Sequence, residues 1–429
     1  MMKITRRGLL ASGAALAATA ATTRFSLGQS SDSATIKLAG FGGDAENTAI
    51  THAIERFNKK YPNVQVDLSM DPISTGWGDY VTKILGEFNA GTGPDVVGTA
   101  IETFQAFAAR GLFIPLDDYV KSTPEFSDFA PSLLDQAKYK GQQIYIPIGW
   151  NNIMINYNRD LFDKAGVAYP KDGNWTWDEF REVARKLTIK DSAGNVTQYG
   201  YEVPNQNFFI QPWFFSNGTG LLKDDWSGSN MLDPKVAESL QFLHDLIHVD
   251  GSSPIPGSAT MDNQFMAGQV AMISRGHWIV QQAKTNGLNM DIANVPSRAS
   301  MTTVIGFGGY AVSKTAQRPD LAQALITELT SAETQVEEGV GGGGVPGRKS
   351  AADNPAFLDF PPSAALYYAS LPNTKAVPSP ANFQEVEKIV IRYYTAMMAD
   401  EVSIADGCKQ AHQELEDSFA RLRQQLGQA

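Results

Sequence analysis

Between residues 35 and 111, apolar residues recur with the spacing of a strand in some segments and with the spacing of a helix in the segments between them. Residues 35–41 and 64–68 are predicted to be strands, and residues 95–97 continue the series as a third strand. The intervening helices are predicted from apolar residues at helical spacing, namely Ile50, Ala53, Ile54 and Phe57, then Tyr80, Ile84 and Phe88, then Phe104, Phe107 and Ala108. Short strands that alternate with amphipathic helices predict an α/β unit, with a parallel sheet covered by helices on both faces.

A second unit with more helix follows residue 142. Thr176 and Glu179 have the spacing of a capping box, which predicts the start of a helix at this point. Residues 236–246 and 264–273 are predicted to be further helices, and a long helix ends the chain. Cys408 lies on the apolar face of that last helix, so a packing role is expected for it.

The composition narrows the class of protein. The chain has 429 residues, of which 43% are hydrophobic and 19% charged, and this predicts a globular protein of two or three compact units. The net charge of −11 argues against broad electrostatic binding to nucleic acid or an anionic membrane. Cys408 is the single cysteine, which excludes an intramolecular disulfide, a cysteine-rich zinc site and an iron–sulfur cluster.

Residues 1–30 have the pattern of an export signal. Arg6 and Arg7 precede an apolar run at residues 9–21, which is too short to span a bilayer. The paired arginines favour the twin-arginine export route, with cleavage between Ala20 and Gln29. A membrane anchor or a disordered tail is the alternative. The expected location is the periplasm, and the mature chain is expected to be soluble because no later stretch has 18 continuous apolar residues.

Five segments carry motifs that occur together in one family. They are residues 38–43, residues 91–97, residues 147–162, residues 265–272 with Gly276 and Trp278, and residues 306–314 with the later Pro346, Gly347 and Arg348. In this order they resemble the extracellular solute-binding proteins of bacterial ABC importers, specifically the carbohydrate-binding family that includes maltose-binding protein. The segments span nearly the whole mature chain.

The resemblance implies a two-lobed α/β fold of the type II periplasmic-binding-protein class, with a hinge and a ligand cleft between the lobes. The expected N-terminal lobe comprises residues 34–147 and 297–335, and the C-terminal lobe comprises residues 148–296 and 336–429. The implied function is to capture a sugar or sugar derivative and deliver it to the transmembrane subunits of an ABC permease. We expect a monomer that needs no cofactor and binds no nucleic acid. The strand pattern points to the same site independently, because ligands of open parallel sheets lie beyond the carboxyl ends of the strands.

A sugar needs flat aromatic rings for its C–H faces and polar groups for its hydroxyls. Trp150, Trp213 and Trp278 fall in the matching segments or in a predicted turn, and Trp77 is a weaker candidate in the loop after the second strand. Core packing is the competing explanation for each of them. The polar candidates are Gly42, Gly43, Asp44, Asn151, Gly308, Gly309 and Arg348. Glycine lets backbone amides approach a ligand closely, whereas Asp44 is equally suited to capping the helix that follows it.

Arg275 and Arg348 suggest a more specific hypothesis. Two guanidinium groups near one cleft could clamp the carboxylate, phosphate or sulfonate of an acidic sugar. The alternative is that Arg348 binds neutral hydroxyls and Arg275 pairs with a surface acid.

Two further motifs are set aside. Residues 342–350 approach a phosphate-binding loop, but Arg348 breaks the spacing and the preceding segment is predicted to be a helix, so a glycine-rich loop that lines the cleft is expected instead. His244 and His248 lie one helical turn apart and could present two imidazoles to a metal ion. Asp245 and Asp250 flank them, yet no third ligand stands out, so a solvated helix face and no metal site are expected.

Catalysis is the alternative function. A secreted glycoside hydrolase or lyase needs paired carboxylates, which Asp44, Glu46 and Asp71 could supply. The sequence has no nucleophile elbow and no metalloprotease motif. No catalytic residue is therefore assigned, and the chain is expected not to be an enzyme.

Overall fold

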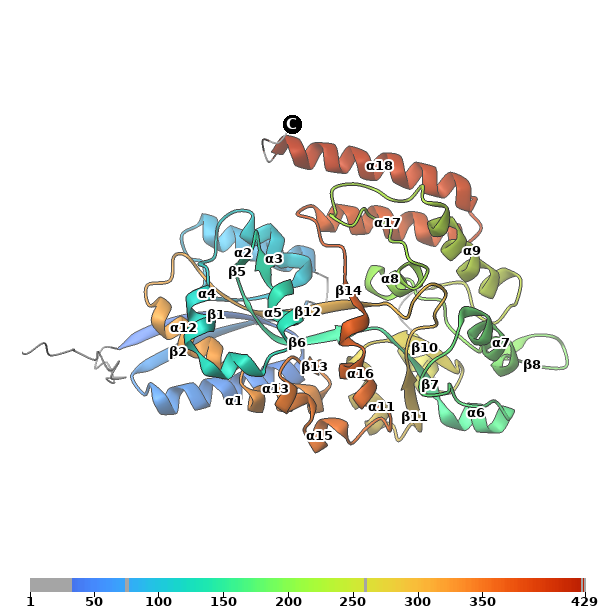
Figure 1. The fold of residues 1–429 in the computed structure, drawn as a ribbon, viewed down its shortest axis with the longest axis horizontal. Coiled ribbons are helices and arrows are strands. Elements are labelled where there is room, and N and C mark those ends of the chain that lie inside the picture. Colours follow the sequence, from blue (N-terminus) through green and yellow to red (C-terminus); the bar gives the residue numbers. More distant parts are fainter. Residues whose placement is uncertain (1–32, 74–76, 258–260, 426, 428–429) are drawn as a thin grey trace, which may run out of the picture. The chain divides into compact units, whose positions relative to one another are not determined.

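The computed structural model describes residues 33–73, 77–257, 261–425 and 427 (Figure 1). The predicted leader at residues 1–30 lies outside the described residues. Ser33–Ala429 forms one compact unit, and the lobe boundaries given above stay predictions. Within the described ranges, none of the helices combines the length and apolar character of a membrane span.

A seven-stranded sheet forms the largest layer. Its strands are β1 (Ala34–Phe41), β2 (Val64–Asp71), β3 (Val96–Ala100), β6 (Ile146–Asn152), β12 (Thr303–Val312), β13 (Val345–Pro346) and β14 (Thr374–Ala376), in the order β13-β6-β12-β3-β1-β2 with β14 beside β12. The predicted parallel pairing is confirmed for β2, β1 and β3. In contrast, β12 runs antiparallel to both β3 and β6, so the sheet is mixed.

The strand β12 returns the chain to this sheet after the smaller sheet of β7, β10 and β11. A register shift lies between Gly308 and Gly309 where β12 pairs with β6. A Cβ at Gly309 would lie 2.1 Å from the backbone oxygen of Ile146, so only glycine allows the two strands to approach this closely.

The other sheets are smaller and antiparallel. They are β10 (Met272–Arg275), β7 (Met154–Asn158) and β11 (Met290–Ala293) in one sheet, β4 (Lys138–Tyr139) with β5 (Gln142–Gln143), and β8 (Ile189–Lys190) with β9 (Val196–Gln198).

Helices surround these sheets. They are α1 (Asp44–Lys60), α2 (Trp77–Asn89), α3 (Ile101–Ala108), α4 (Asp117–Ser122), α5 (Pro131–Gln136), α6 (Arg159–Ala165), α7 (Trp177–Leu187), α8 (Asn207–Phe215), α9 (Pro234–His248), α10 (Met261–Met266), α11 (Val280–Thr285), α12 (Pro319–Leu329), α13 (Ala332–Gly341), α14 (Lys349–Ala352), α15 (Pro355–Leu358), α16 (Ala365–Ala369), α17 (Phe383–Met398) and α18 (Ile404–Gln425), with 3-10 turns η1 (Pro124–Asp128), η2 (His277–Ile279) and η3 (Leu371–Asn373). Helix α1 packs against α12 and α13, and α17 lies beside α18 with both in contact with α9 (Figure 1).

Local signals in the sequence explain several of these boundaries. The predicted capping box at the start of α7 is confirmed, since the side chain of Thr176 accepts from the backbone N–H of Glu179, and Glu179 accepts from that of Thr176. Cys408 is buried in the core, as expected. The helix predicted at residues 264–273 is wrong. Helix α10 ends at Met266, the chain turns at Gly268 with φ +68°, and β10 begins at Met272. A glycine in the left-handed conformation ends the helix there.

Candidate functional site

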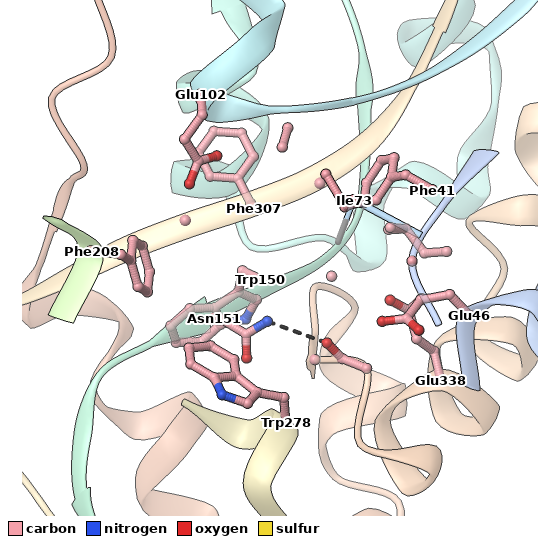
Figure 2. A pocket seen from close by; sticks show the side chains of 18 of the residues that line it. Phe41, Glu46, Ile73, Glu102, Trp150, Asn151, Phe208, Trp278, Phe307 and Glu338 are labelled. Carbon is pink, nitrogen blue, oxygen red and sulfur yellow. Dashed lines mark hydrogen bonds between the residues drawn. The ribbon is translucent and has the colours of Figure 1, made fainter. Parts of the chain in front are cut away.

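A pocket of about 250 Å³ opens beside the central strands of the large sheet (Figure 2). Its walls come from the ends of β1 and β3, the starts of α1, α2 and α3, the middle of β6 and β12, and residues of α8, η2 and α13. The lining residues are Phe41, Gly42, Glu46, Ile73, Trp77, Ala100, Glu102, Ile148, Gly149, Trp150, Asn151, Phe208, Trp278, Gly306, Phe307, Gly308, Glu338, Gly343 and Gly344. The ends of β1 and β3 contribute to it, which agrees with the general rule for ligands of open sheets.

Partly exposed aromatic side chains define much of the wall. Phe41, Trp77, Phe208 and Trp278 all line the pocket and are half-buried. Phe41 and Trp77 meet edge to face, with their ring centroids 5.1 Å apart. Trp278 stacks on Phe209 with centroids 5.6 Å apart. The wall therefore offers the apolar ring surfaces that a sugar face requires.

Glycines make room for three of these rings. A Cβ at Gly276 would lie 2.1 Å from the indole of Trp278, and one at Gly306 would lie 2.7 Å from the ring of Phe208. A Cβ at Gly308 would lie 2.8 Å from the ring of Phe41. Each ring therefore lies against backbone where any other residue would displace it.

Asn151 connects two walls of the pocket. Its Nδ2 donates to the backbone oxygen of Gly343 at 3.3 Å, and its Oδ1 accepts from the backbone N–H of His277 at 3.3 Å. The first of these bonds is drawn in Figure 2. The amide thus ties the glycine-rich loop after α13 to η2, which carries Trp278.

Carboxyl groups are the titratable side chains that line the pocket. Glu46 and Glu338 point toward one another on one side, and Glu102 projects from another wall (Figure 2). Burial, with a smaller contribution from the charge of Glu46, raises the pKa of Glu338 to about 8. Burial raises the pKa of Glu102 to about 7. Glu338 Oε2 has no hydrogen-bond partner among the described residues, so it is available to a ligand hydroxyl.

The structure places half of the predicted site residues at this pocket. These are Gly42, Trp77, Trp150, Asn151, Trp278 and Gly308. Trp150 is 1% exposed, and its Nε1 donates to the backbone oxygen of Pro346, so its ring contributes mainly to the core. The expected glycine-rich loop also lines the pocket, through Gly343 and Gly344.

Trp213 lies away from the pocket. It is in α8 instead of the predicted turn, although Pro212 lies inside the same helix. Trp213 is 2% exposed and packs against Trp177, Phe180 and Tyr201. The sequence around Pro212 suggested a turn, but this helix is buried almost all round, so the competing explanation of core packing applies to Trp213.

Arg348 also lies outside the pocket. It is 3% exposed, its Nε donates to the backbone oxygen of Thr330 at 2.6 Å, and its Nη1 donates to that of Glu125. The guanidinium lies over the ring of Phe129, 4.4 Å from its centroid. Burial lowers the pKa of Arg348. These contacts give Arg348 a structural role in joining the end of α12 to η1.

Arg275 is the other member of the predicted clamp. Its Nε donates to Asp262 at 2.6 Å, its Nη1 donates to the backbone oxygen of Ser274, and its guanidinium lies over Phe209. Because neither arginine lines the pocket, this geometry gives no support to an anion clamp. The alternative stated above, in which Arg275 pairs with an acid, fits its contact with Asp262.

The remaining candidates lie beside the pocket. Gly43 precedes α1, and its N–H donates to Glu46 Oε2 at 2.9 Å. Asp44 is exposed in the first turn of α1 and lines a different pocket of about 620 Å³ against α13. Gly309 is where β6 and β12 approach closely.

Sequence reasoning missed several lining residues. Phe41 ends the first predicted strand, and Phe208 lies in a continuous apolar run, so neither could be told from a core residue. Glu338 comes from a helix distant in the sequence from Glu46. One signal was available: Gly306 and Gly308 are two residues apart, so they lie on the same face of a strand. Glycine inside a strand often marks a place where another group approaches the backbone closely.

The fold and the pocket define a ligand-binding protein of the two-lobed type II class. The structure matches an ABC substrate-binding protein from Listeria monocytogenes in complex with cycloalternan, with a TM-score of 0.79 and 22% identity over 91% of this chain and 100% of that chain. It also matches the sugar-binding protein MalE from Xanthomonas citri, with a TM-score of 0.80 and 19% identity over 92% of this chain and 100% of that one. The predicted fold class is confirmed.

The chain belongs to the bacterial extracellular solute-binding proteins, whose family pattern it matches over residues 52–362. The predicted family resemblance is thereby confirmed. A maltotriose-binding protein of Pyrococcus abyssi is 25% identical over 56% of this chain and 49% of its own length. A galactooligosaccharide-binding protein of Bacillus subtilis is 24% identical over 73% of each chain. The match thus spans about half the length of the Pyrococcus relative and 58% of a putative binding protein of Brucella abortus.

Proposed function

We propose that this protein is the sugar-binding component of an ABC importer. The observation that carries the proposal is the pocket wall in which Phe41, Trp77, Phe208 and Trp278 remain half-buried around hydrogen-bonding groups. Such a wall fits the alternating apolar and hydroxyl surfaces of a sugar. Named relatives that bind maltotriose and galactooligosaccharide support the same ligand class.

The proposed ligand is a sugar without an acidic group. Glu46, Glu102 and Glu338 line the pocket, whereas no lysine, arginine or histidine is among the described residues that line it. Carboxyl groups form hydrogen bonds with hydroxyls, and those that are ionised repel an anionic ligand. This lining favours a neutral sugar over an acidic one.

The proposed mechanism is capture and delivery without chemistry. A ligand that contacts both lobes stabilises the closed state by its higher affinity for that state, and the closed form docks on the permease subunits. Export by the twin-arginine route, a periplasmic location and a monomeric state belong to the same proposal.

Glycoside hydrolysis remains the competing function, and one observation favours it. Burial raises the pKa of Glu338 to about 8, and this carboxyl faces Glu46. A carboxyl that keeps its proton beside a second carboxyl group is what an acid-catalysed glycosidase requires.

One experiment separates these possibilities. Purified protein is screened by thermal shift with neutral monosaccharides and oligosaccharides and with their uronic acid counterparts, and the mixtures are then analysed for cleavage products. We expect a neutral sugar to raise the melting temperature and to be recovered intact. Released product would instead identify a hydrolase, and a response confined to the acidic sugars would overturn the ligand class.

A further inference from the structure

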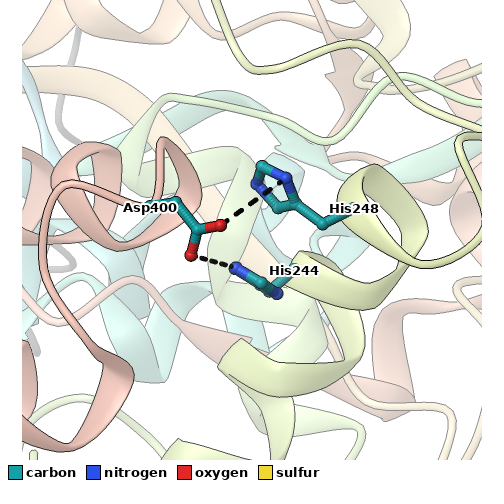
Figure 3. A group of neighbouring side chains, drawn as sticks. All are labelled: His244, His248 and Asp400. Atoms are coloured by element: carbon teal, nitrogen blue, oxygen red, sulfur yellow. Dashed lines mark hydrogen bonds and ion pairs between the residues drawn. The ribbon is translucent and has the colours of Figure 1, made fainter.

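Two histidines and an aspartate, none of which lines the pocket, form a compact group (Figure 3). His244 and His248 lie one turn apart on α9, and Asp400 lies in the turn between α17 and α18. The side-chain atoms that could bind a metal ion all lie within 4.8 Å of one another. Asp400 thus supplies the third ligand that the sequence did not reveal.

The spacing of these atoms suits a small divalent ion. His244 Nε2 is 2.9 Å from Asp400 Oδ1, and His248 Nδ1 is 3.9 Å from Asp400 Oδ2. Ligands at about 2.0–2.1 Å from a tetrahedral zinc ion lie roughly 3.4 Å apart, which falls between the two observed distances. Small side-chain rotations are enough to close around an ion, with the fourth position left to water.

The second nitrogen of His248 is already oriented. Its Nε2 lies 2.9 Å from the backbone oxygen of Met398, so Nε2 carries the proton and donates it. Nδ1 then presents a lone pair toward Asp400. A histidine that donates its other N–H to a backbone carbonyl is the usual arrangement around a bound metal ion.

His244 faces Asp400 with the ring nitrogen that would bind the ion. In the metal-free protein its Nε2 is hydrogen-bonded to Asp400, while Nδ1 has no partner among the described residues. An ion at Nε2 would replace this hydrogen bond, since a nitrogen that binds a metal ion carries no proton.

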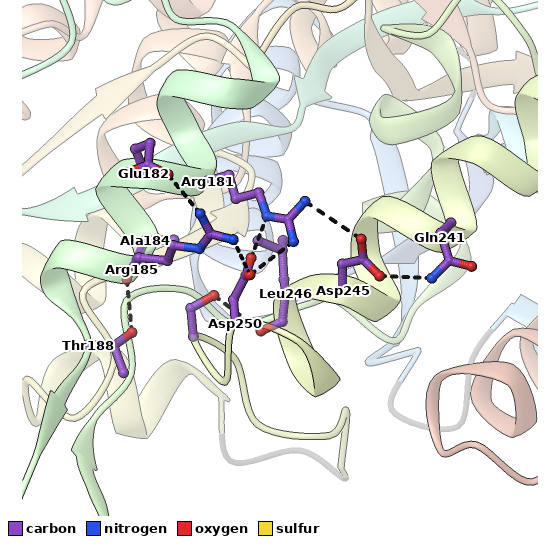
Figure 4. A network of polar contacts seen from close by, with 10 residues as sticks. Arg181, Glu182, Ala184, Arg185, Thr188, Gln241, Asp245, Leu246 and Asp250 are labelled. Carbon is purple, nitrogen blue, oxygen red and sulfur yellow. Dashed lines mark hydrogen bonds and ion pairs between the residues drawn. The ribbon is translucent and has the colours of Figure 1, made fainter.

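The acids that flank the histidine pair in the sequence are engaged elsewhere (Figure 4). Asp250 accepts from Arg181 Nε at 2.6 Å and from Arg185 Nη2 at 2.5 Å. Burial raises the pKa of Asp250, but the hydrogen bonds from these arginines outweigh that effect and lower it overall. Asp245 lies 3.6 Å from Arg181 Nη1. Asp400 is thus the acid that faces the imidazoles.

The backbone of Asp400 holds its carboxylate at this position. Its φ of +61° lies in the left-handed region, where aspartate and asparagine are tolerated better than most residues. The side chains of His244, His248 and Asp400 are 16%, 24% and 65% exposed, so an ion can enter from solvent.

We propose that His244, His248 and Asp400 bind one divalent transition-metal ion, with Zn²⁺ as the expected occupant. Two imidazoles favour Zn²⁺, Ni²⁺ or Cu²⁺ over Mg²⁺ and Ca²⁺, which prefer all-oxygen sites. The ion joins α9 to the turn between α17 and α18, and it stabilises the folded chain because the unfolded chain does not hold the three groups together.

The test uses untagged mature protein treated with EDTA and then dialysed. Titration with Co²⁺ should give one equivalent of bound metal with the visible absorption of a tetrahedral centre, and Zn²⁺ should displace it. Zn²⁺ should also raise the melting temperature, whereas Mg²⁺ at the same concentration should not. Failure of Co²⁺ and Zn²⁺ to bind at micromolar concentration would overturn the proposal.

Variants locate the ion. We expect His248→Gln and Asp400→Asn to weaken Zn²⁺ binding at least about tenfold, since each removes a ligand. Asparagine keeps the left-handed backbone of position 400, and melting in EDTA checks that both variants fold. His52→Gln is the matched control, because His52 also lies 3.1 Å from a carboxylate, that of Glu337, but belongs to no such three-residue group in the part of the chain that the structure describes. Unchanged binding in both ligand variants, or equal loss in the control, rejects the site.

Discussion

Two regions of this protein are rich in aromatic residues, but the rings have different roles in them. Around Trp213, the rings of Trp177, Phe180 and Tyr201 lie 5.3–5.9 Å away, and all are buried. At the pocket, the rings of Trp278, Phe208 and Phe41 lie against glycine backbone and remain half-buried.

The difference lies in what each ring packs against. A ring enclosed by other rings loses nearly all its exposed surface and contributes to stability. At the pocket, the three rings held against glycine keep surface available for a ligand. Aromatic content alone therefore does not identify a sugar site, whereas a half-buried aromatic residue at a pocket is a stronger indication.

The largest expected effect is in the buried cluster. Trp213→Ala should lower the free energy of unfolding by about 3–5 kcal/mol because it leaves a cavity among packed rings. Trp213→Phe should cost clearly less. Urea denaturation gives the stability, and calorimetric titration of the remaining folded protein should give nearly unchanged sugar affinity. If Trp213→Phe lowered the sugar affinity without lowering stability, this cluster would belong to the binding site and the two regions would not differ in role.

At the pocket we expect the opposite: a loss of sugar affinity with little change in stability. Trp278→Ala should reduce sugar binding by about 2 kcal/mol, roughly thirtyfold, because it removes a ring surface from the wall. The melting temperature without ligand should change little. Trp226→Ala is the control, since Trp226 is also partly exposed but lines a different pocket. Equal losses of affinity in the two variants would contradict the assignment.

A substitution beneath a ring tests the role of glycine. Gly306→Ala places a methyl group 2.7 Å from Phe208 and should displace that ring, at a cost of about 1 kcal/mol in sugar binding. Gly86→Ala is the matched control in helix α2, where a Cβ would have nothing within 4 Å, and it should leave affinity unchanged. Isothermal titration compares the two. If Gly306→Ala binds as tightly as the wild type, the glycine is not needed for the ring position.

The smallest effect, when expressed per pH unit, concerns the buried carboxyl of the pocket. An unfolded glutamate loses its proton near pH 4.3 (about the model-peptide value), whereas folded Glu338, with a pKa of about 8, keeps it longer. Unfolding between these values releases a proton, so wild-type stability should fall as the pH rises from about 4.5 to 8. Glu338→Gln should remove this contribution, which we expect to be below about 1 kcal/mol per pH unit after allowance for pocket water. Parallel urea titrations at pH 5 and pH 8 measure the difference, and identical pH slopes would show that Glu338 is ionised throughout.

Local patterns made much of the fold predictable. Strands and helices from residue 35 to 111, the start of α7 and the packing face of α18 follow from periodicity and capping. The helix predicted at residues 264–273 failed because a turn at Gly268 and pairing with β7 override the local apolar pattern. The antiparallel return of β12 likewise depends on distant partners.

The site was predictable only where a residue carries its own signal. Trp278, Asn151 and Gly42 were found through motifs, and the pocket includes them. Trp213 and Arg348 carried equally attractive side chains, yet one lies among rings and the other bonds backbone oxygens at 3% exposure. Whether a guanidinium faces a ligand or a carbonyl depends on tertiary packing, which a single sequence does not contain. The third member of the histidine group was missed for the same reason, since Asp400 is 152 residues beyond His248.

The two hydrogen bonds of Asn151 have a consequence for how ligand preference can change. One side chain sets the separation between the loop at Gly343 and the turn that carries Trp278. The width of the pocket and the position of the Trp278 ring are therefore coupled, and a replacement of Asn151 changes both together. A variant that accepts a bulkier sugar must either replace Asn151 or keep its two hydrogen bonds and widen the pocket elsewhere.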